Sequence, residues 1–147
     1  MKHIQVIIIT KIMSSSKRLH VSYTKTNPEN LEVYSGRASG IDDGSLKEEE
    51  LAEKIMAKRD SSHHKNEDGF DVYDIDKISN NYEAIRGREQ MLIEYNGGAK
   101  SKGGTSGNSI NSISDRNPKK KKYLLTALKI FGSITSLIAV FWLFTGL

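Results

Sequence analysis

Hydrophobic and polar positions alternate over short runs in the first third of the chain, a pattern that predicts β-strands with one buried face. Two such runs, residues 20–25 (HVSYTK) and 31–34 (LEVY), flank the turn-forming sequence TNPEN. We therefore expect a β-hairpin here. A short apolar piece at residues 72–75 (VYDI) is a candidate third strand.

Two further segments have the 3.6-residue spacing of amphipathic helices. Ser45 and Glu48 have the spacing of a capping box, which predicts a helix over residues 45–59 with Arg59 along its buried stripe. Asn80 and Glu83 have the same spacing and predict a second helix that reaches Tyr95. The second helix carries two charged residues within its apolar arc, Arg88 and Glu89.

These elements predict a small α/β domain of the α+β kind, in which helices flank a three-stranded antiparallel sheet. We expect the domain to cover residues 20–96, after an N-terminal extension over 1–19. Residues 97–122 are rich in Gly, Ser, Asn and Lys and suit either a mobile linker or an ordered loop. Within the extension, the apolar run at 4–10 is too short to span a bilayer and suits an added strand, a loose terminus or a poor signal peptide.

The last 25 residues, 123–147, carry only one charge, that of Lys129. This length predicts a hydrophobic C-terminal helix that crosses a membrane. Four lysines precede it at 119–122 and no charge follows, so the positive-inside rule predicts a single-pass C-terminal anchor with the N-terminal domain in the cytoplasm. The alternative is an apolar helix that covers a partner or the domain itself.

Composition adds few limits. A chain of 147 residues has room for one small domain and an appendage. The net charge of +4 permits a polyanionic partner without requiring one. Because the chain has no cysteine, disulfides and thiolate metal sites are excluded.

Several polar residues stand out among the predicted core elements. VSY ends at Tyr23 and YSG begins at Tyr34, with ten residues between the two tyrosines. KRDSSHH and REQMLIEYNGG follow and supply, in chain order, the remaining candidates: Arg59, His63, His64, Glu89 and Asn96. In this order the chain resembles the GIY-YIG nuclease superfamily. YSGRASG, RDSSHH and GNSINSISDRNP further resemble the C-terminal toxin domains of Rhs-type polymorphic toxins.

The resemblance implies a metal-dependent endonuclease that acts on DNA or RNA, with an immunity protein as a further partner if the chain is a secreted or delivered toxin. It implies that Tyr23 removes a proton from water, that Tyr34 supports it, and that His63 or His64 takes part in proton transfer. The chemistry of the residues agrees. A lone carboxylate such as Glu89 can hold magnesium or manganese, and the guanidinium of Arg59 suits phosphoryl oxygens.

Flanking phosphates are expected to contact four further residues: Arg37, which we expect to be exposed beside a tight turn at Gly36, and Asn96, Lys100 and Lys102.

Each of these residues also has a structural interpretation. The tyrosines are ordinary strand residues, and Arg59 suits a helix C-terminus. The histidines can belong to a solvated loop, Glu89 can pair with Arg59, and Asn96 before two glycines can end a helix. The rival function is therefore a membrane-anchored, non-catalytic interaction protein with a degenerate nuclease fold.

Overall fold

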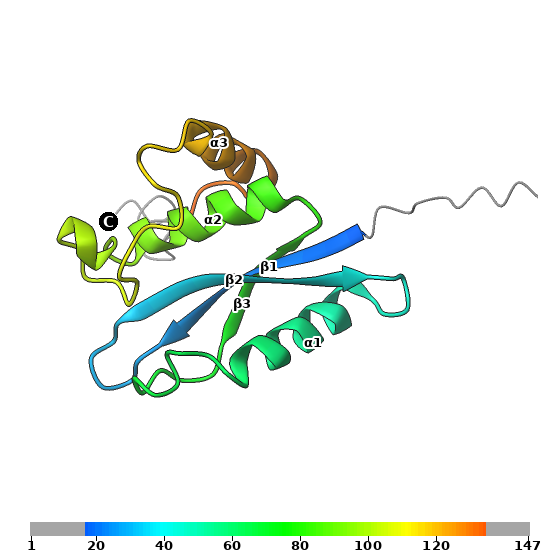
Figure 1. The fold of residues 1–147 in the computed structure, drawn as a ribbon, viewed down its shortest axis with the longest axis horizontal. Helices are drawn as coiled ribbons and strands as arrows, with labels where there is room; N and C mark the ends of the chain where they lie inside the picture. Colours follow the sequence, from blue (N-terminus) through cyan, green and yellow to red (C-terminus); the bar gives the residue numbers. More distant parts are fainter. Residues whose placement is uncertain (1–16, 135–147) are drawn as a thin grey trace, which may run out of the picture.

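The structure is a computed structural model that describes residues 17–134. Strands β1 (Lys17–Thr26), β2 (Val33–Asp42) and β3 (Asp74–Ser79) form one antiparallel sheet in the order β2-β1-β3. Helix α1 (Glu48–Asp60) covers one face of the sheet and α2 (Tyr82–Tyr95) covers the other (Figure 1). Helix α3 (Lys120–Phe131) packs on the outer side of α2. The predicted α+β class, with a three-stranded antiparallel sheet flanked by helices, is confirmed.

The two faces of the central strand β1 are stabilised differently. One face is apolar, and the buried cluster between it and α1 comprises Leu19, Val21, Tyr23, Ala52, Ile55 and Met56. The other face carries Ser22, which donates a 2.8 Å hydrogen bond to Asp76 of β3. Arg88 of α2 donates two 2.8 Å bonds to the same carboxylate. Arg88, one of the charged residues inside the predicted apolar arc, thus joins α2 to the sheet through a partly buried ion pair.

Gly36 lies in the middle of β2, so the tight turn expected there is wrong. Its backbone pairs with that of Tyr23 on β1. A Cβ atom at position 36 would lie 2.5 Å from Cζ of the Tyr23 ring. Glycine is therefore needed because the Tyr23 ring packs directly over the strand.

The other elements differ from expectation at their ends. The hairpin strands are longer than predicted, and the third strand begins only at Asp74, with Val72 73% exposed before it. Helix α1 begins after Lys47, whose N–H is 3.4 Å from the Glu50 carboxylate, so the predicted Ser45 cap is wrong. Helix α2 is capped by Asn81, which accepts a 3.0 Å bond from the Ala84 N–H.

Residues 97–118 are an ordered loop rather than a mobile linker, with a 3₁₀ turn η1 at Lys100–Lys102. The Gly107 N–H donates a 2.8 Å bond to the Val33 carbonyl at the edge of β2. Ile113 is fully buried, and its N–H donates to the Gln90 side chain of α2 at 3.0 Å. The loop therefore bridges the edge of the sheet and α2.

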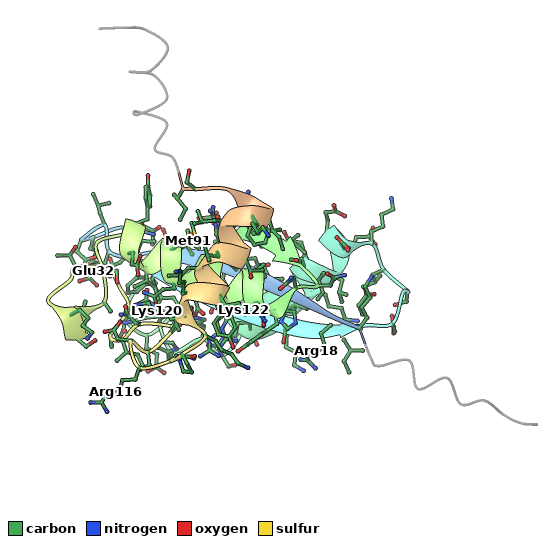
Figure 2. The ribbon with its side chains drawn as sticks, turned by 90° about the horizontal axis from the view of Figure 1, so that it is seen from above. Arg18, Glu32, Met91, Arg116, Lys120 and Lys122 are labelled. Carbon is green, nitrogen blue, oxygen red and sulfur yellow. The ribbon has the colours of Figure 1, made fainter. Side chains whose placement is uncertain are left out.

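Helix α3 lies across α2 in the view from above in Figure 2, and the contact between the two helices includes Gly87 of α2. A Cβ there would be 2.1 Å from the carbonyl oxygen of Tyr123, so α3 approaches α2 more closely than another residue would allow. Within residues 17–134, no helix has both the length and the apolar character needed to cross a membrane. The rest of the predicted C-terminal helix, 135–147, and the predicted extension up to residue 16 lie outside the described residues.

Candidate active site

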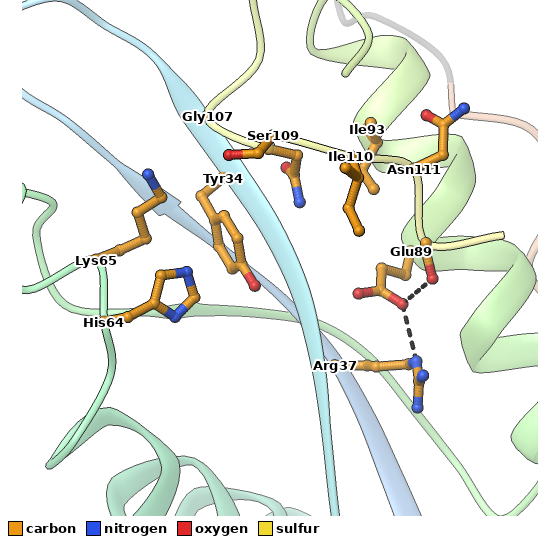
Figure 3. Close-up of a pocket in the computed structure, with 12 residues that line it drawn as sticks. Tyr34, Arg37, His64, Lys65, Glu89, Ile93, Gly107, Ser109, Ile110 and Asn111 are labelled. Atoms are coloured by element: carbon orange, nitrogen blue, oxygen red, sulfur yellow. Dashed lines mark hydrogen bonds and ion pairs between the residues drawn. The ribbon is translucent and has the colours of Figure 1, made fainter. Parts of the chain in front are cut away.

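A cavity of about 340 Å³ lies at the edge of the sheet formed by β2. Its walls come from β2, α2, the segment after α1 and the 97–118 loop (Figure 3). Tyr34 and Arg37 leave β2 on opposite faces, because side chains alternate along a strand. Both line the cavity, so it extends around the strand edge and can receive groups from both faces of the sheet.

Glu89 supplies the carboxylate of this cavity. Its Oε2 accepts a 2.9 Å hydrogen bond from Arg37 Nε and another from the Ser112 hydroxyl. No hydrogen bond from residues 17–134 reaches Oε1, which is directed toward Tyr34 in Figure 3. Burial raises the pKa of Glu89, and the bonds from Ser112 and Arg37 act in the opposite direction because they stabilise the charged form.

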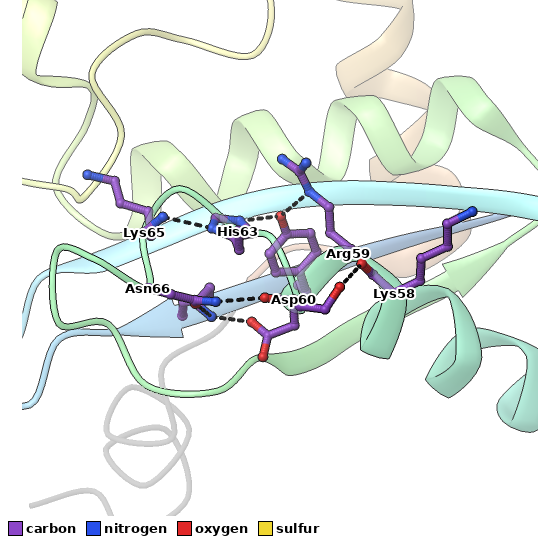
Figure 4. Close-up of polar contacts among 9 residues, drawn as sticks. Lys58, Arg59, Asp60, His63, Lys65 and Asn66 are labelled. Carbon is purple, nitrogen blue, oxygen red and sulfur yellow. Dashed lines mark hydrogen bonds and ion pairs between the residues drawn. The ribbon is translucent and has the colours of Figure 1, made fainter.

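A second group of polar residues surrounds Tyr23, and it adjoins the cavity because its member His63 stacks on the cavity residue His64. Figure 4 shows His63 and Arg59 of this group. The Lys65 N–H donates to His63 Nδ1 at 3.1 Å, so the proton of neutral His63 lies on Nε2. His63 Nε2 is 2.8 Å from Tyr23 Oη and therefore donates to it. Arg59 Nε donates to the same oxygen at 3.4 Å. The Tyr23 oxygen thus accepts hydrogen bonds from two donors, and this arrangement would stabilise a negative charge on it.

The environment sets the protonation states of the aromatic residues. Burial, with smaller contributions from Arg59 and His64, lowers the pKa of His63 to about 4. Burial and Lys65 lower the pKa of His64 as well. Burial raises the pKa of Tyr34 to about 12 and also raises that of Tyr23. At neutral pH both imidazoles are therefore neutral and both phenols protonated.

A buried lysine holds the histidine segment against the sheet. Lys25 of β1 has a side chain only 1% exposed and donates to Asp60 and, at 2.7 Å, to Asn66. In the segment between Asp60 and Asn66, the ring of His63 stacks on that of His64 with centroids 4.6 Å apart. The contacts fix both imidazoles beside Tyr34, whose ring meets them edge-on at 5.2 and 5.4 Å.

The oxygen-bearing groups around Glu89 are of the kind that a hard divalent cation prefers. Among residues 17–134 there is no group of three or more His, Cys, Asp or Glu side chains placed to hold a metal. Magnesium keeps most of its waters and can be held by one carboxylate, and the cavity adds oxygen donors from Ser109, Asn111 and Ser112. Magnesium or manganese at this carboxylate stays a prediction, and Glu89 Oε1 is the oxygen that would hold the ion.

The structure brings seven of the predicted residues together. Four line the cavity: Tyr34, Arg37, His64 and Glu89. Three form the adjoining group: Tyr23, Arg59 and His63. The pairing of Glu89 with Arg59, which was the structural alternative, is not observed, because the guanidinium on Glu89 belongs to Arg37.

The other three predicted residues lie elsewhere. Asn96 ends α2, donates a 2.9 Å bond to the Leu92 carbonyl and lines a different cavity beside Arg88. Lys100 pairs with Glu32 at 2.9 Å, and Lys102 pairs with Asp115 at 2.7 Å. Their predicted contacts with phosphates would have to compete with these carboxylates.

Sequence reasoning missed several residues of the site, among them Lys65, Asn108 and Ser112. Asn108 accepts from the Ser35 N–H and donates to the Ser35 carbonyl, both at 2.8 Å, and so fixes the loop to β2. The polar run GNSINSISDRNP, which carried part of the family resemblance, was the available signal. Nothing in its local pattern indicates which Asn or Ser contacts the sheet.

Comparisons of the chain with models of protein families, with curated proteins and with solved structures found no match.

Proposed function

We propose that this protein is a metal-dependent nucleic-acid phosphodiesterase, an endonuclease of the GIY-YIG type. One observation carries the proposal: residues from three separate segments, Tyr34 and Arg37 of β2, His64 after α1 and Glu89 of α2, converge on one open cavity, where Arg37 bonds to Glu89. Nothing in the local sequence requires these groups to meet. Polar, titratable groups gathered in a cavity are typical of an active site.

Two guanidinium groups supply the charge that phosphodiester hydrolysis needs. Arg37 lines the cavity, and Arg59 lies beside Tyr23 at its border. Planar guanidinium groups bind phosphoryl oxygens in pairs and stabilise the charge that grows on them in the transition state. A magnesium or manganese ion on Glu89, when bound, would add positive charge at the same place.

Proton transfer has two candidate groups. The resemblance assigns removal of the water proton to Tyr23, whose phenolate would be stabilised by donors from His63 and Arg59. His64 is the second candidate, because it lines the cavity, is neutral at pH 7, and its ring nitrogens make no hydrogen bond to residues 17–134. His63 is unsuited to accept a proton from Tyr23, since its Nε2 already carries one.

The rival proposal, a membrane-anchored interaction protein without catalysis, is supported by α3. Leu125, Leu128 and Ile130 on this helix are 50%, 43% and 49% exposed, and lysines stand at its start. An exposed apolar face beside basic residues suits a lipid surface or another protein, such as an immunity protein.

A cleavage assay on the full chain tests the catalytic proposal. We expect cleavage of plasmid DNA or of total RNA in magnesium and none in EDTA. Glu89→Gln keeps an acceptor for Ser112 and Arg37 but loses the charge, and we expect a loss of activity of about a hundredfold or more. Glu94→Gln, on the exposed side of the same helix, is the matched control. Folded protein that cuts neither polymer would contradict the proposal and favour the rival.

A further inference from the structure

A second cavity, of about 440 Å³, continues from the first along β2 and reaches the last turn of α1. The two cavities share Arg37. We call the second one the basic groove, and its walls are formed by Arg37, Ala38, Ser39, Ile55, Lys58, Arg59 and Ser62. Three of these seven side chains are cationic and none is acidic.

Small residues on β2 keep the basic groove open. Ala38, Ser39 and Gly40 follow one another on the strand. A Cβ at Gly40 would lie 2.7 Å from the Ile55 side chain, so the strand and α1 are packed closely beneath the groove. Arg18 of the neighbouring strand donates a 2.9 Å bond to the Ser39 hydroxyl and adds another guanidinium near the groove.

The cations of the basic groove are only partly neutralised, since Arg37 is paired with Glu89 but the other two are not paired with any carboxylate of the described residues. Among residues 17–134, no salt bridge involves Lys58, Arg59 or Arg18. By contrast, Lys100 and Lys102 are paired with carboxylates. Figure 4 shows Lys58 and Arg59 extending from the end of α1 toward β2. A groove with unpaired cations has a positive potential that attracts anions.

We propose that the basic groove binds the phosphodiester backbone of a nucleic acid next to the phosphate held in the Glu89 cavity. This inference rests on the proposed function, since it states how the substrate continues beyond that cavity. Arg37, common to both cavities, marks the point where the strand passes from one to the other. The contacts are with phosphates, so they serve DNA and RNA alike and carry no base sequence.

The groove can be tested by binding, separately from cleavage. Full-length Glu89→Gln protein in EDTA is titrated with labelled single-stranded DNA, duplex DNA and RNA at several salt concentrations. Adding Lys58→Gln should weaken binding several-fold on all sequences and reduce the slope of log K against log salt by about 0.7 to 0.9. Lys54→Gln is the matched control, because Lys54 is exposed one turn earlier on α1 and does not line the groove. Lys100→Gln tests whether a lysine that is already paired with a carboxylate, that of Glu32, also contributes to binding.

Smaller changes for Lys54→Gln and Lys100→Gln than for Lys58→Gln would support the groove. Equal changes for all three lysines, or no binding at all, would overturn it. If the protein cleaves nucleic acid but the Lys58→Gln variant binds it normally, only the proposal about the groove is wrong and the proposed function stands. If cleavage is absent while binding depends on Lys58, the groove stands as the nucleic-acid site of a non-catalytic protein and the proposed function fails.

Discussion

At the scale of single residues, Arg37 has two opposing effects on Glu89. Its hydrogen bond to Oε2 stabilises the charged carboxylate in a buried position, where an unpaired charge would be costly. The same positive charge repels a cation on Oε1. We infer that Arg37 weakens metal binding while it strengthens phosphate binding, so its two contributions should separate in a single variant.

Arg37→Gln should therefore lower the magnesium concentration that gives half-maximal cleavage, and at the same time weaken binding of nucleic acid. Both values are measured on the full chain, the first by cleavage over a magnesium series and the second by titration in EDTA. Arg116→Gln is the control, because Arg116 is exposed and does not line the Glu89 cavity (Figure 2). A higher magnesium requirement in Arg37→Gln would contradict the argument.

His63 makes stability depend on pH. Its pKa is about 4 in the folded protein because of burial, and near 6.5 in an unfolded chain. Between these two pKa values the unfolded state binds more protons than the folded state. The free energy of unfolding should therefore have its full value above about pH 6.5 and decrease as the pH drops toward 4. Chemical denaturation at a series of pH values measures this, and His63→Gln should flatten the decrease. An unchanged pH dependence in that variant would show that other groups cause it.

At the scale of elements, the 97–118 loop protects part of an exposed sheet edge. Gly107 and Asn108 pair with the backbone of Val33 and Ser35, where an additional strand would otherwise bind. From this anchor the loop continues to Ser112, which donates to Glu89. The loop therefore links the stability of the edge to the geometry of the candidate site.

Asn108→Ala should cost about 2 to 4 kcal/mol of unfolding free energy, because it leaves the buried N–H and carbonyl of Ser35 without partners. Urea denaturation measures the loss. Asn111→Ala is the control, since Asn111 lies in the same loop and its side chain makes no hydrogen bond to residues 17–134. Similar stability of the two variants would mean that the loop contributes little to the edge.

At the scale of the whole molecule, α3 connects the domain to the uncharged C-terminal sequence. Tyr123 and Ala127 are buried against α2, while much of the opposite side is exposed and apolar. Residues 135–147 follow without a charge. The proposed anchor would therefore begin directly beside the domain, with the four lysines at 119–122 near the lipid headgroups.

The full chain should sediment with vesicles that contain anionic lipid, and a chain ending at residue 134 should not, because the shorter chain lacks the uncharged segment. Circular dichroism of both chains checks that the domain stays folded. If the full chain remains in the supernatant, the anchor is wrong, and the exposed side of α3 is left as a surface for a protein partner.

Local patterns in the sequence determined most of the elements. Alternation predicted the hairpin, helical spacing predicted α1 and α2, and the resemblance named Tyr23, Tyr34, Arg59 and Glu89 as a group. The hairpin and the helices depend on neighbours a few residues apart, and the resemblance depends on short motifs in a fixed order, so both can be found in a linear pattern. The ends of the helices and strands were less well predicted. Helix α2, for example, is capped by Asn81 and not by Asn80, and this choice depends on the backbone geometry at a single residue.

The tertiary structure alone decided which polar groups meet. Lys100 and Lys102 are paired and Lys58 is not, Asn108 rather than Asn96 contacts β2, and Gly36 makes room for a ring instead of a turn. Each of these outcomes depends on a contact between residues distant in sequence. The sequence by itself therefore determined the elements and the types of candidate residues, and the packing of the sheet, helices and loop decided which side chains share a cavity and which charges stay free.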